Sequence, residues 1–225
     1  YDKIKEIDSK LSSFSTRFNE KERNRTDNIK LAAKKLDNII LMPGESFSMN
    51  KTLGPRTPEN GFKTAPIMLK SELVLGIGGG ICQVSSTLYN AVLLAGLDVI
   101  ERTHHSAPLS YISAGRDATV NEDSIDFRFV NSLDYPICIQ ADVKGNVLTV
   151  SVLGRKPKDG RTYKLKTQTL AVYPPGEDEI IIDNTLPFGE KVVERKPIRG
   201  LRVVLYRETY INGKLHKREK LTEDY

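Results

Sequence analysis

The sequence predicts an α+β fold, in which a mixed α+β principal domain, with a helix packed against a sheet, precedes a small, elongated all-β domain. Three observations predict this fold class. Two segments have apolar residues at helical spacing, several others are strand-like with hairpin turns, and a polar stretch precedes a β-rich C-terminal part. We therefore expect a lead-in segment at 1–23, a principal domain at 24–154, a linker at 155–162 and a separate β domain at 163–225.

Two helices are expected in the principal domain. Apolar residues recur every three or four positions from 24 to 40, and Asn24 or Thr26 is placed to cap this helix. The same periodicity runs from 81 to 97, where Gly96 is placed to end the helix.

Strands are expected in much of the remaining chain. The segment 41–80 is rich in Gly, Pro and Asn, which is typical of loop with short strands. Lys144-Gly145-Asn146 and Asn212-Gly213 each predict a hairpin turn. The expected strands cover residues 124–130, 135–143, 147–153, 203–210 and 214–215.

Composition indicates a globular chain with interleaved charges. The net charge is +5, with 34 basic and 29 acidic residues, which favours a solvated surface over nucleic-acid binding and is compatible with an anionic partner such as a cell wall. No apolar run is long enough for a transmembrane segment. Because the sequence begins at Tyr1 rather than Met, we expect a fragment whose anchor or export signal lies upstream.

The two cysteines are too few for a disulfide scaffold and lack the paired spacing of a structural zinc site. Cys138 lies in an apolar run and is expected in a core strand, whereas His216 is expected at the surface.

A glycine-rich turn places Cys82 at the start of the second helix. Gly78, Gly79 and Gly80 allow positive φ and the close approach of a substrate chain. Free N–H groups and the helix dipole in the first turn favour a thiolate, and those N–H groups are also candidates to hold an oxyanion. The alternative is a small buried cysteine beside an ordinary turn. A phosphate loop is disfavoured, since no Gly-Lys-Ser/Thr follows the glycines.

A nucleophilic cysteine needs a base, and a loop after this helix contains His104 and His105. Asp117 is a candidate to orient the imidazole as the third member of a triad. As alternatives, the histidines lie at the surface, Arg116 and Asp117 form a structural ion pair, or Cys82 and the two histidines bind zinc.

Residues 10–153 resemble the VanW domain family, which is associated with glycopeptide resistance. The resemblance is carried by an ordered series of motifs. They are Asn24-Arg25, Asn28-Ile29, Pro43-Gly44-Glu45-Ser46-Phe47-Ser48, Asn50, Leu53-Gly54-Pro55, Gly78 to Asn90, Glu101-Arg102, His105-Ser106, Tyr111, Gly115 to Val120 and Asp126-Phe127-Arg128-Phe129.

The C-terminal part resembles the G-five domain, a β module often attached to cell-wall proteins. Its motifs are Gly189-Glu190, Arg199-Gly200, Tyr206-Arg207-Glu208, Asn212-Gly213-Lys214 and Leu221 to Tyr225. One glycine follows Arg199 where the family often has two.

The VanW resemblance implies an extracytoplasmic protein of the bacterial cell envelope, and a catalytic domain for L,D-transpeptidation of peptidoglycan stem peptides without a metal or cofactor. It implies Cys82 as nucleophile, His105 as general base and acid, and Asp117 as a residue that orients His105 or holds substrate. The residues expected to contact substrate are Gly79, Gly80, Gln83, Ser85, Ser86, Tyr89, His104 and Arg116. The alternatives are a non-catalytic wall- or glycopeptide-binding module and a cysteine peptidase or amidase.

Overall fold

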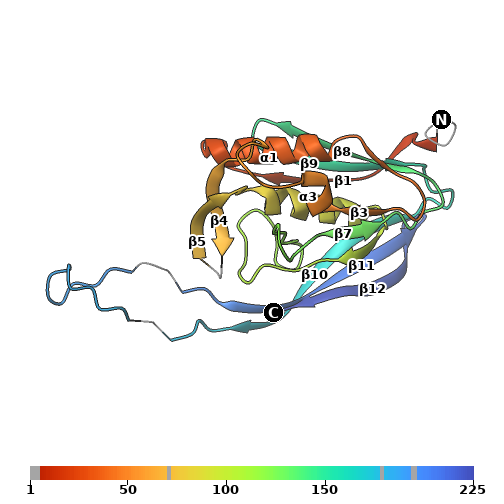
Figure 1. The fold of residues 1–225 in the computed structure, drawn as a ribbon. Coiled ribbons are helices and arrows are strands. Elements are labelled where there is room, and N and C mark those ends of the chain that lie inside the picture. Colours follow the sequence, from red (N-terminus) through yellow and green to blue (C-terminus); the bar gives the residue numbers. More distant parts are fainter. Residues whose placement is uncertain (1–5, 70–71, 178–179, 194–196) are drawn as a thin grey trace.

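The computed structural model describes residues 6–69, 72–177, 180–193 and 197–225. Strands predominate over helices in these residues, as an α+β class with a C-terminal all-β part allows. The largest sheet is antiparallel, and two helices, α1 and α3, contact it (Figure 1). Its strand order is β1 (Ser9–Arg17), β9 (Val147–Gly154), β8 (Ile137–Lys144) and β2 (Ile39–Leu41), with α1 at Arg23–Leu36 and α3 at Ile81–Leu94.

Smaller elements surround α3 and carry the loops of the site. The short helix α2 (Met49–Leu53) follows β3, and a hairpin leads directly into the glycine turn before α3. The hairpin is β4 (Thr64–Leu69) with β5 (Glu72–Ile77), and a three-stranded sheet has the order β3 (Ser46–Ser48), β7 (Arg128–Val130) and β6 (Asp98–Glu101).

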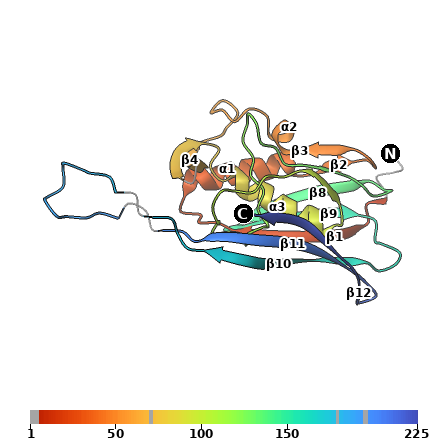
Figure 2. The ribbon, with the colours of Figure 1, turned by 90° about the horizontal axis from the view of Figure 1, so that it is seen from below.

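The C-terminal sheet consists of β10 (Thr162–Tyr173), β11 (Gly200–Ile211) and β12 (Lys214–Asp224). Asn212 and Gly213 have φ values of 49° and 77°, so the expected hairpin turn is confirmed, and its strands are longer than predicted. Residues 180–193, between β10 and β11, lie away from the body, while β12 returns beneath α3 (Figures 1 and 2). This shape agrees with the elongated β domain that was expected.

The C-terminal sheet shares its buried surface with the principal domain. Leu205 is fully buried and belongs to the main hydrophobic core. Arg207 donates from Nη1 to the carbonyl oxygen of Leu97 at 2.8 Å, and the Tyr163 ring lies against Gly96. We expected a separate unit, but long-range packing joins the sheet to α3 and the loop after it.

The first helix differs from its prediction at both ends. It begins after Glu22, which makes no side-chain cap, so the predicted caps at Asn24 and Thr26 are wrong. It ends at Leu36, because Asn38 adopts a left-handed φ of 63° and Ile39 then pairs with Ile139 in the sheet. Local periodicity does not reveal this switch from helix to strand.

Other segments follow the sequence more closely. The 1–23 lead-in contributes the edge strand β1, which the sequence did not predict. The hairpin of β8 and β9 is confirmed, whereas strand pairing in the 124–130 region is confined to β7. The second helix ends at Leu94, with Gly96 at a φ of 80° just beyond it. No helix among the described residues is long and apolar enough to cross a membrane.

Replacement of Gly96 tests the junction between the two domains. Gly96→Ala forces a non-glycine residue into left-handed φ, which costs about 1–2 kcal/mol, and puts a Cβ 2.4 Å from the Tyr163 ring. Gly145→Ala is the matched control, because Gly145 also has positive φ but has nothing within 4 Å of an added Cβ. Urea unfolding should show the larger loss for Gly96→Ala, and equal losses would contradict the close packing at this junction.

Candidate active site

The turn before α3 holds its glycines by close contact. Gly78 and Gly80 have φ values of 85° and 107°, and a Cβ on Gly79 would lie 2.5 Å from the Pro66 carbonyl oxygen. The buried Asn28 amide donates to the carbonyl oxygen of Gly79 at 3.0 Å. These contacts fix the direction in which α3 begins, and therefore the position of Cys82, its second residue.

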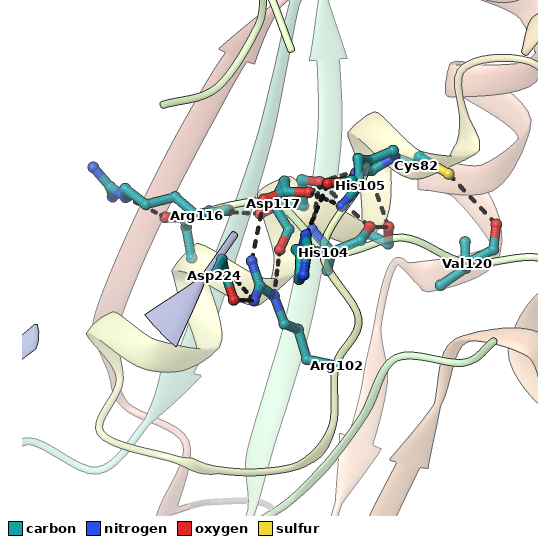
Figure 3. Close-up of polar contacts among 12 residues, drawn as sticks. Cys82, Arg102, His104, His105, Arg116, Asp117, Val120 and Asp224 are labelled. Carbon is teal, nitrogen blue, oxygen red and sulfur yellow. Dashed lines mark hydrogen bonds and ion pairs between the residues drawn. The ribbon is translucent and has the colours of Figure 1, made fainter. Parts of the chain in front are cut away.

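The Cys82 side chain is half-buried and faces the loop after α3. Its Sγ lies 3.4 Å from the carbonyl oxygen of Val120 (Figure 3). The His105 side chain also acts on the sulfur, through hydrogen bonding and charge that lower the pKa of the thiol. Since His105 Nδ1 lies 2.6 Å from Oδ2 of Asp117, the other ring nitrogen, Nε2, is left for the sulfur. Cys82, His105 and Asp117 thus lie in the order that the sequence predicted.

Polar side chains on one face of α3 hold the loop in register with the helix. Ser85 donates to the carbonyl oxygen of Ala118 at 2.5 Å, and the Ala118 amide donates to Ser86 at 2.9 Å. One turn further along, Asn90 donates to the carbonyl oxygen of Arg116 at 2.7 Å. This face of the helix therefore positions Asp117, which contacts His105, and Val120, which contacts Cys82.

The Asp117 carboxylate is held by three groups. Oδ2 accepts from both the backbone and the ring of His105, at 2.7 and 2.6 Å, and Oδ1 lies 3.1 Å from Nη2 of Arg102. Burial raises the pKa of Asp117, but these hydrogen bonds and the charge of Arg102 lower it more, so the net pKa lies below its ordinary value. Asp117 is therefore an anion that fixes the orientation of His105.

The electrostatics of the pair favour a thiolate and an imidazolium. Burial lowers the pKa of His105, but its hydrogen bonds with Asp117 and Cys82 outweigh burial and raise it to about 9. Burial raises the pKa of the Cys82 thiol, but its hydrogen bond to His105 and the positive charges of His105 and Arg56 outweigh burial and lower it. Shifts in these two directions favour the thiolate and imidazolium over the neutral pair, which is the condition that a nucleophilic cysteine requires.

Several predicted substrate contacts lie beneath the surface. Gln83, Ser85, Ser86 and Tyr89 are at most 1% exposed. The Gln83 amide donates to the Arg17 carbonyl oxygen at 2.8 Å. A substrate cannot reach side chains buried to this degree in this conformation, so direct contact does not fit, and we propose that they position the helix and loop. Gly80, which is partly exposed, remains a candidate at the turn, whereas Gly79 is buried and packed against Pro66.

Arg116 points away from Cys82 (Figure 3). It donates from Nε to Asn90 at 2.7 Å and lies over the Phe14 ring, with 4.8 Å between its Cζ and the ring centroid. The arginine paired with Asp117 is Arg102, so the alternative in which Arg116 and Asp117 form an ion pair is wrong. His104 bonds through Nδ1 to the carbonyl oxygen of His105 at 2.8 Å, which supports the bend of this loop.

The expectation of free first-turn amides also needs correction. The N–H groups of Ile81 and Gln83 donate to the carbonyl oxygens of Gly78 and Gly80, at 3.2 and 3.1 Å. These amides are therefore engaged by the turn itself in this conformation, and they are not available to hold an oxyanion.

Three residues of the site, Arg56, Tyr111 and Arg102, were not predicted as site residues. Arg56 contributes positive charge to Cys82, and its buried Nε has no hydrogen-bond partner among the described residues. Tyr111 hydrogen-bonds with Ser86, and burial followed by the charge of Cys82 raises its pKa. Arg102 lies two residues before the histidines, so its position in the Glu101-Arg102 motif was the signal available in the sequence.

Within the described part of the chain, no three His, Cys, Asp or Glu side chains are grouped so that they could hold a metal ion. The zinc alternative therefore finds no ligand set in these residues. Cys138 is buried in β8, and burial raises the pKa of its thiol. Its position in a core strand is as expected.

The fold and site define an α+β protein in which a helix presents a cysteine to a histidine and an aspartate, joined to a C-terminal β sheet. Residues 24–153 match the family model of VanW like protein, and residues 164–225 match that of the G5 domain. The chain belongs to the VanW family and carries a G5 domain after the VanW region.

Two curated proteins illustrate the relationship. The chain is 43% identical over 155 residues to the uncharacterized protein YoaR of Bacillus subtilis, covering 69% of this chain and 51% of that protein. It is 32% identical over 145 residues to the vancomycin B-type resistance protein VanW of Enterococcus faecalis, covering 61% of this chain and 53% of that protein. The chain therefore spans about half the length of these relatives. No solved structure gives a significant match.

Alkylation of the two cysteines tests the charge state of the site. Cys82 should react with iodoacetamide at about pH 6.5, where an ordinary thiol is about 1% ionised. Cys138 should react only at much higher pH, because burial raises the pKa of its thiol. Peptide mass spectrometry resolves both rates in one sample. Equal pH profiles for the two cysteines would contradict the lowered pKa of Cys82.

The pH dependence of stability tests the bond between His105 and Asp117. In Cys82→Ser, where the thiol no longer titrates, the hydrogen bond and charge of Asp117 still act to raise the pKa of His105, and the stability that this bond contributes is fully present below about pH 6.5. This contribution is lost as the pH rises through the folded-state pKa of His105. The difference in unfolding free energy between Cys82→Ser and Cys82→Ser/His105→Gln should therefore shrink as the pH rises, as urea denaturation would measure. A difference that grows with pH would contradict the direction of this shift.

Proposed function

We propose that this protein is a cell-wall L,D-transpeptidase that uses Cys82 as its nucleophile. The observation that carries the proposal is geometric: the imidazole that interacts with Cys82 is itself held at 2.6 Å by the buried Asp117 carboxylate. The lowered direction of the Cys82 pKa supports it. Membership of the VanW family, the G5 domain and the similarity to a vancomycin resistance protein support a cell-wall-related, extracytoplasmic role. Peptidoglycan stem peptides are the proposed substrates.

The first half-reaction breaks one amide bond and forms a thioester. The Cys82 thiolate attacks the carbonyl carbon of the third stem residue, and negative charge develops on the carbonyl oxygen. Protonated His105 donates its proton to the nitrogen of the terminal D-alanine as the bond between carbon and nitrogen breaks. The donor stem then remains attached to Cys82 through sulfur, and His105 is neutral.

The second half-reaction restores the Cys82 thiolate and the protonated His105. The side-chain amine of the third residue of another stem attacks the thioester carbonyl and loses its proton to neutral His105. The bond between carbon and sulfur breaks, which returns Cys82 to the thiolate. The product is a 3-3 cross-link, and Asp117 holds the imidazole in one orientation through both proton transfers.

Arg56 is the proposed contact for negative charge on the substrate. Its Nε is buried without a partner among the described residues, and its charge acts on the sulfur. An arginine fork suits either a carboxylate or a developing oxyanion. Two first-turn amides are bonded within the turn, and Arg56 Nη2 donates to Asn50, so the contribution that we propose for Arg56 is its positive charge near the sulfur and the developing oxyanion.

The test uses the purified protein and disaccharide-tetrapeptide fragments of peptidoglycan. Mass spectrometry should find a 3-3 cross-linked dimer and a tripeptide thioester on Cys82. Cys82→Ala should lose both products to below about one thousandth of the native amount. Cys138→Ala is the matched control and should retain them, since Cys138 lies in the sheet away from His105.

Other outcomes identify the alternative functions. Release of tripeptide with no dimer would indicate a cysteine peptidase, because water then resolves the thioester. No adduct and no product, with equal wall binding by native protein and Cys82→Ala, would indicate a non-catalytic binding module. Either result would contradict the transpeptidase proposal.

A further inference from the structure

We propose that Asp224, in the last strand of the C-terminal β domain, is a positioning residue for Cys82 and His105 and acts through Arg102 and Asp117. The inference deepens the proposed function, on which it rests for its catalytic meaning. It assigns to the β domain a part in building the site.

The arginine between the two domains bonds a carboxylate in each. Arg102 Nη1 lies 2.7 Å from both carboxylate oxygens of Asp224. On the other side, Arg102 donates to the side chain of Asp117 at 3.1 Å and to its carbonyl oxygen at 2.7 Å. The side chains of Arg102, Asp117 and Asp224 are 5%, 9% and 10% exposed, so water screens these contacts little.

The guanidinium has little freedom while both carboxylates are present. Its plane lies by the buried Tyr89 ring, with 5.4 Å between the Arg102 Cζ and the ring centroid. The N–H groups of a guanidinium have fixed directions, so bonding at Nη1 determines where Nη2 points. Nη2 holds one oxygen of Asp117, and the other oxygen of Asp117 holds the ring and backbone of His105.

Loss of Asp224 would therefore act at a distance from the sulfur. Arg102 would keep its contacts with Asp117 but lose the two bonds that set its angle. The Asp117 carboxylate could then rotate, and its short contact with His105 would lengthen. A less stabilised imidazolium holds a thiolate less well, so Cys82 would ionise at higher pH.

The neighbouring residue provides a control within the same strand. Glu223 contacts Arg202 and Lys220, and both of these residues belong to the C-terminal part of the chain. Glu223→Gln therefore removes one negative charge from β12 without touching Arg102. Asp224, unlike Glu223, also lines a cavity of about 220 Å³ together with His105 and Asp117, at the junction of the domains.

The experiment measures the pH profile of Cys82 alkylation by peptide mass spectrometry in the full chain. In Asp224→Asn, the rate at about pH 6.5 should fall roughly three- to tenfold, which corresponds to a rise of about half to one pKa unit. The rate at about pH 10 should equal that of the native protein. Glu223→Gln should keep the native profile, and Asp224→Glu should restore part of the rate.

A structural role for Asp224 alone predicts a different result. A lower melting temperature with an unchanged Cys82 profile in Asp224→Asn would overturn the proposal. If Asp224→Asn does not fold, Arg102→Lys is measured instead, because lysine keeps the charge but cannot hold both carboxylates with a fixed fork. A native profile in Arg102→Lys would overturn the proposal equally.

The outcome is separable from that of the proposed function. A shifted Cys82 profile in a protein that makes no cross-link would support the positioning role and overturn the transpeptidase. Native cross-linking in Asp224→Asn with a native profile would leave the transpeptidase standing and overturn the positioning role.

Discussion

The buried Asp117 carboxylate is the constraint on which the site depends. A buried anion is costly unless cations and donors surround it, and here it requires Arg102 on one oxygen and His105 on the other. The partners are balanced, since Asp117 and Asp224 face Arg102 and a protonated His105. A thiolate at Cys82 adds one negative charge, and the positive charge of Arg56 compensates for it.

The same network explains why the two family regions form one structural body. The C-terminal sheet has few buried apolar residues of its own, which are Val203, Val204 and Leu205. Leu205 completes the main core, and Asp224 completes the charge network. Apolar and ionic contacts therefore both require the sheet to lie at one place against α3. A displacement of the sheet would break the bonds between Arg102 and Asp224.

The sequence predicted the parts of the site that depend on local pattern. The apolar stripe of 81–97 and Gly96 predicted α3, and the glycine turn predicted where Cys82 begins it. The need of a cysteine for a base drew attention to His104, His105 and Asp117, and the resemblance to a family favoured His105 over His104. The bond from Arg102 to Asp224 spans 122 positions and has no local signal. Arg116 was named as a substrate contact because an arginine suits a carboxylate, yet Asn90 and the Phe14 ring hold its side chain away from Cys82.

The two cysteines show how the position of a thiol in the fold changes its pKa. Burial raises the thiol pKa at both places, and at Cys138 the nearby charge of Asp37 raises it further. At Cys82 an imidazolium and a guanidinium reverse the direction. The difference arises from the loop after α3, whose backbone is held by serines of the helix. The lowered pKa of Cys82 therefore depends on the pairing of helix and loop, and without that pairing burial would raise it, as it does at Cys138.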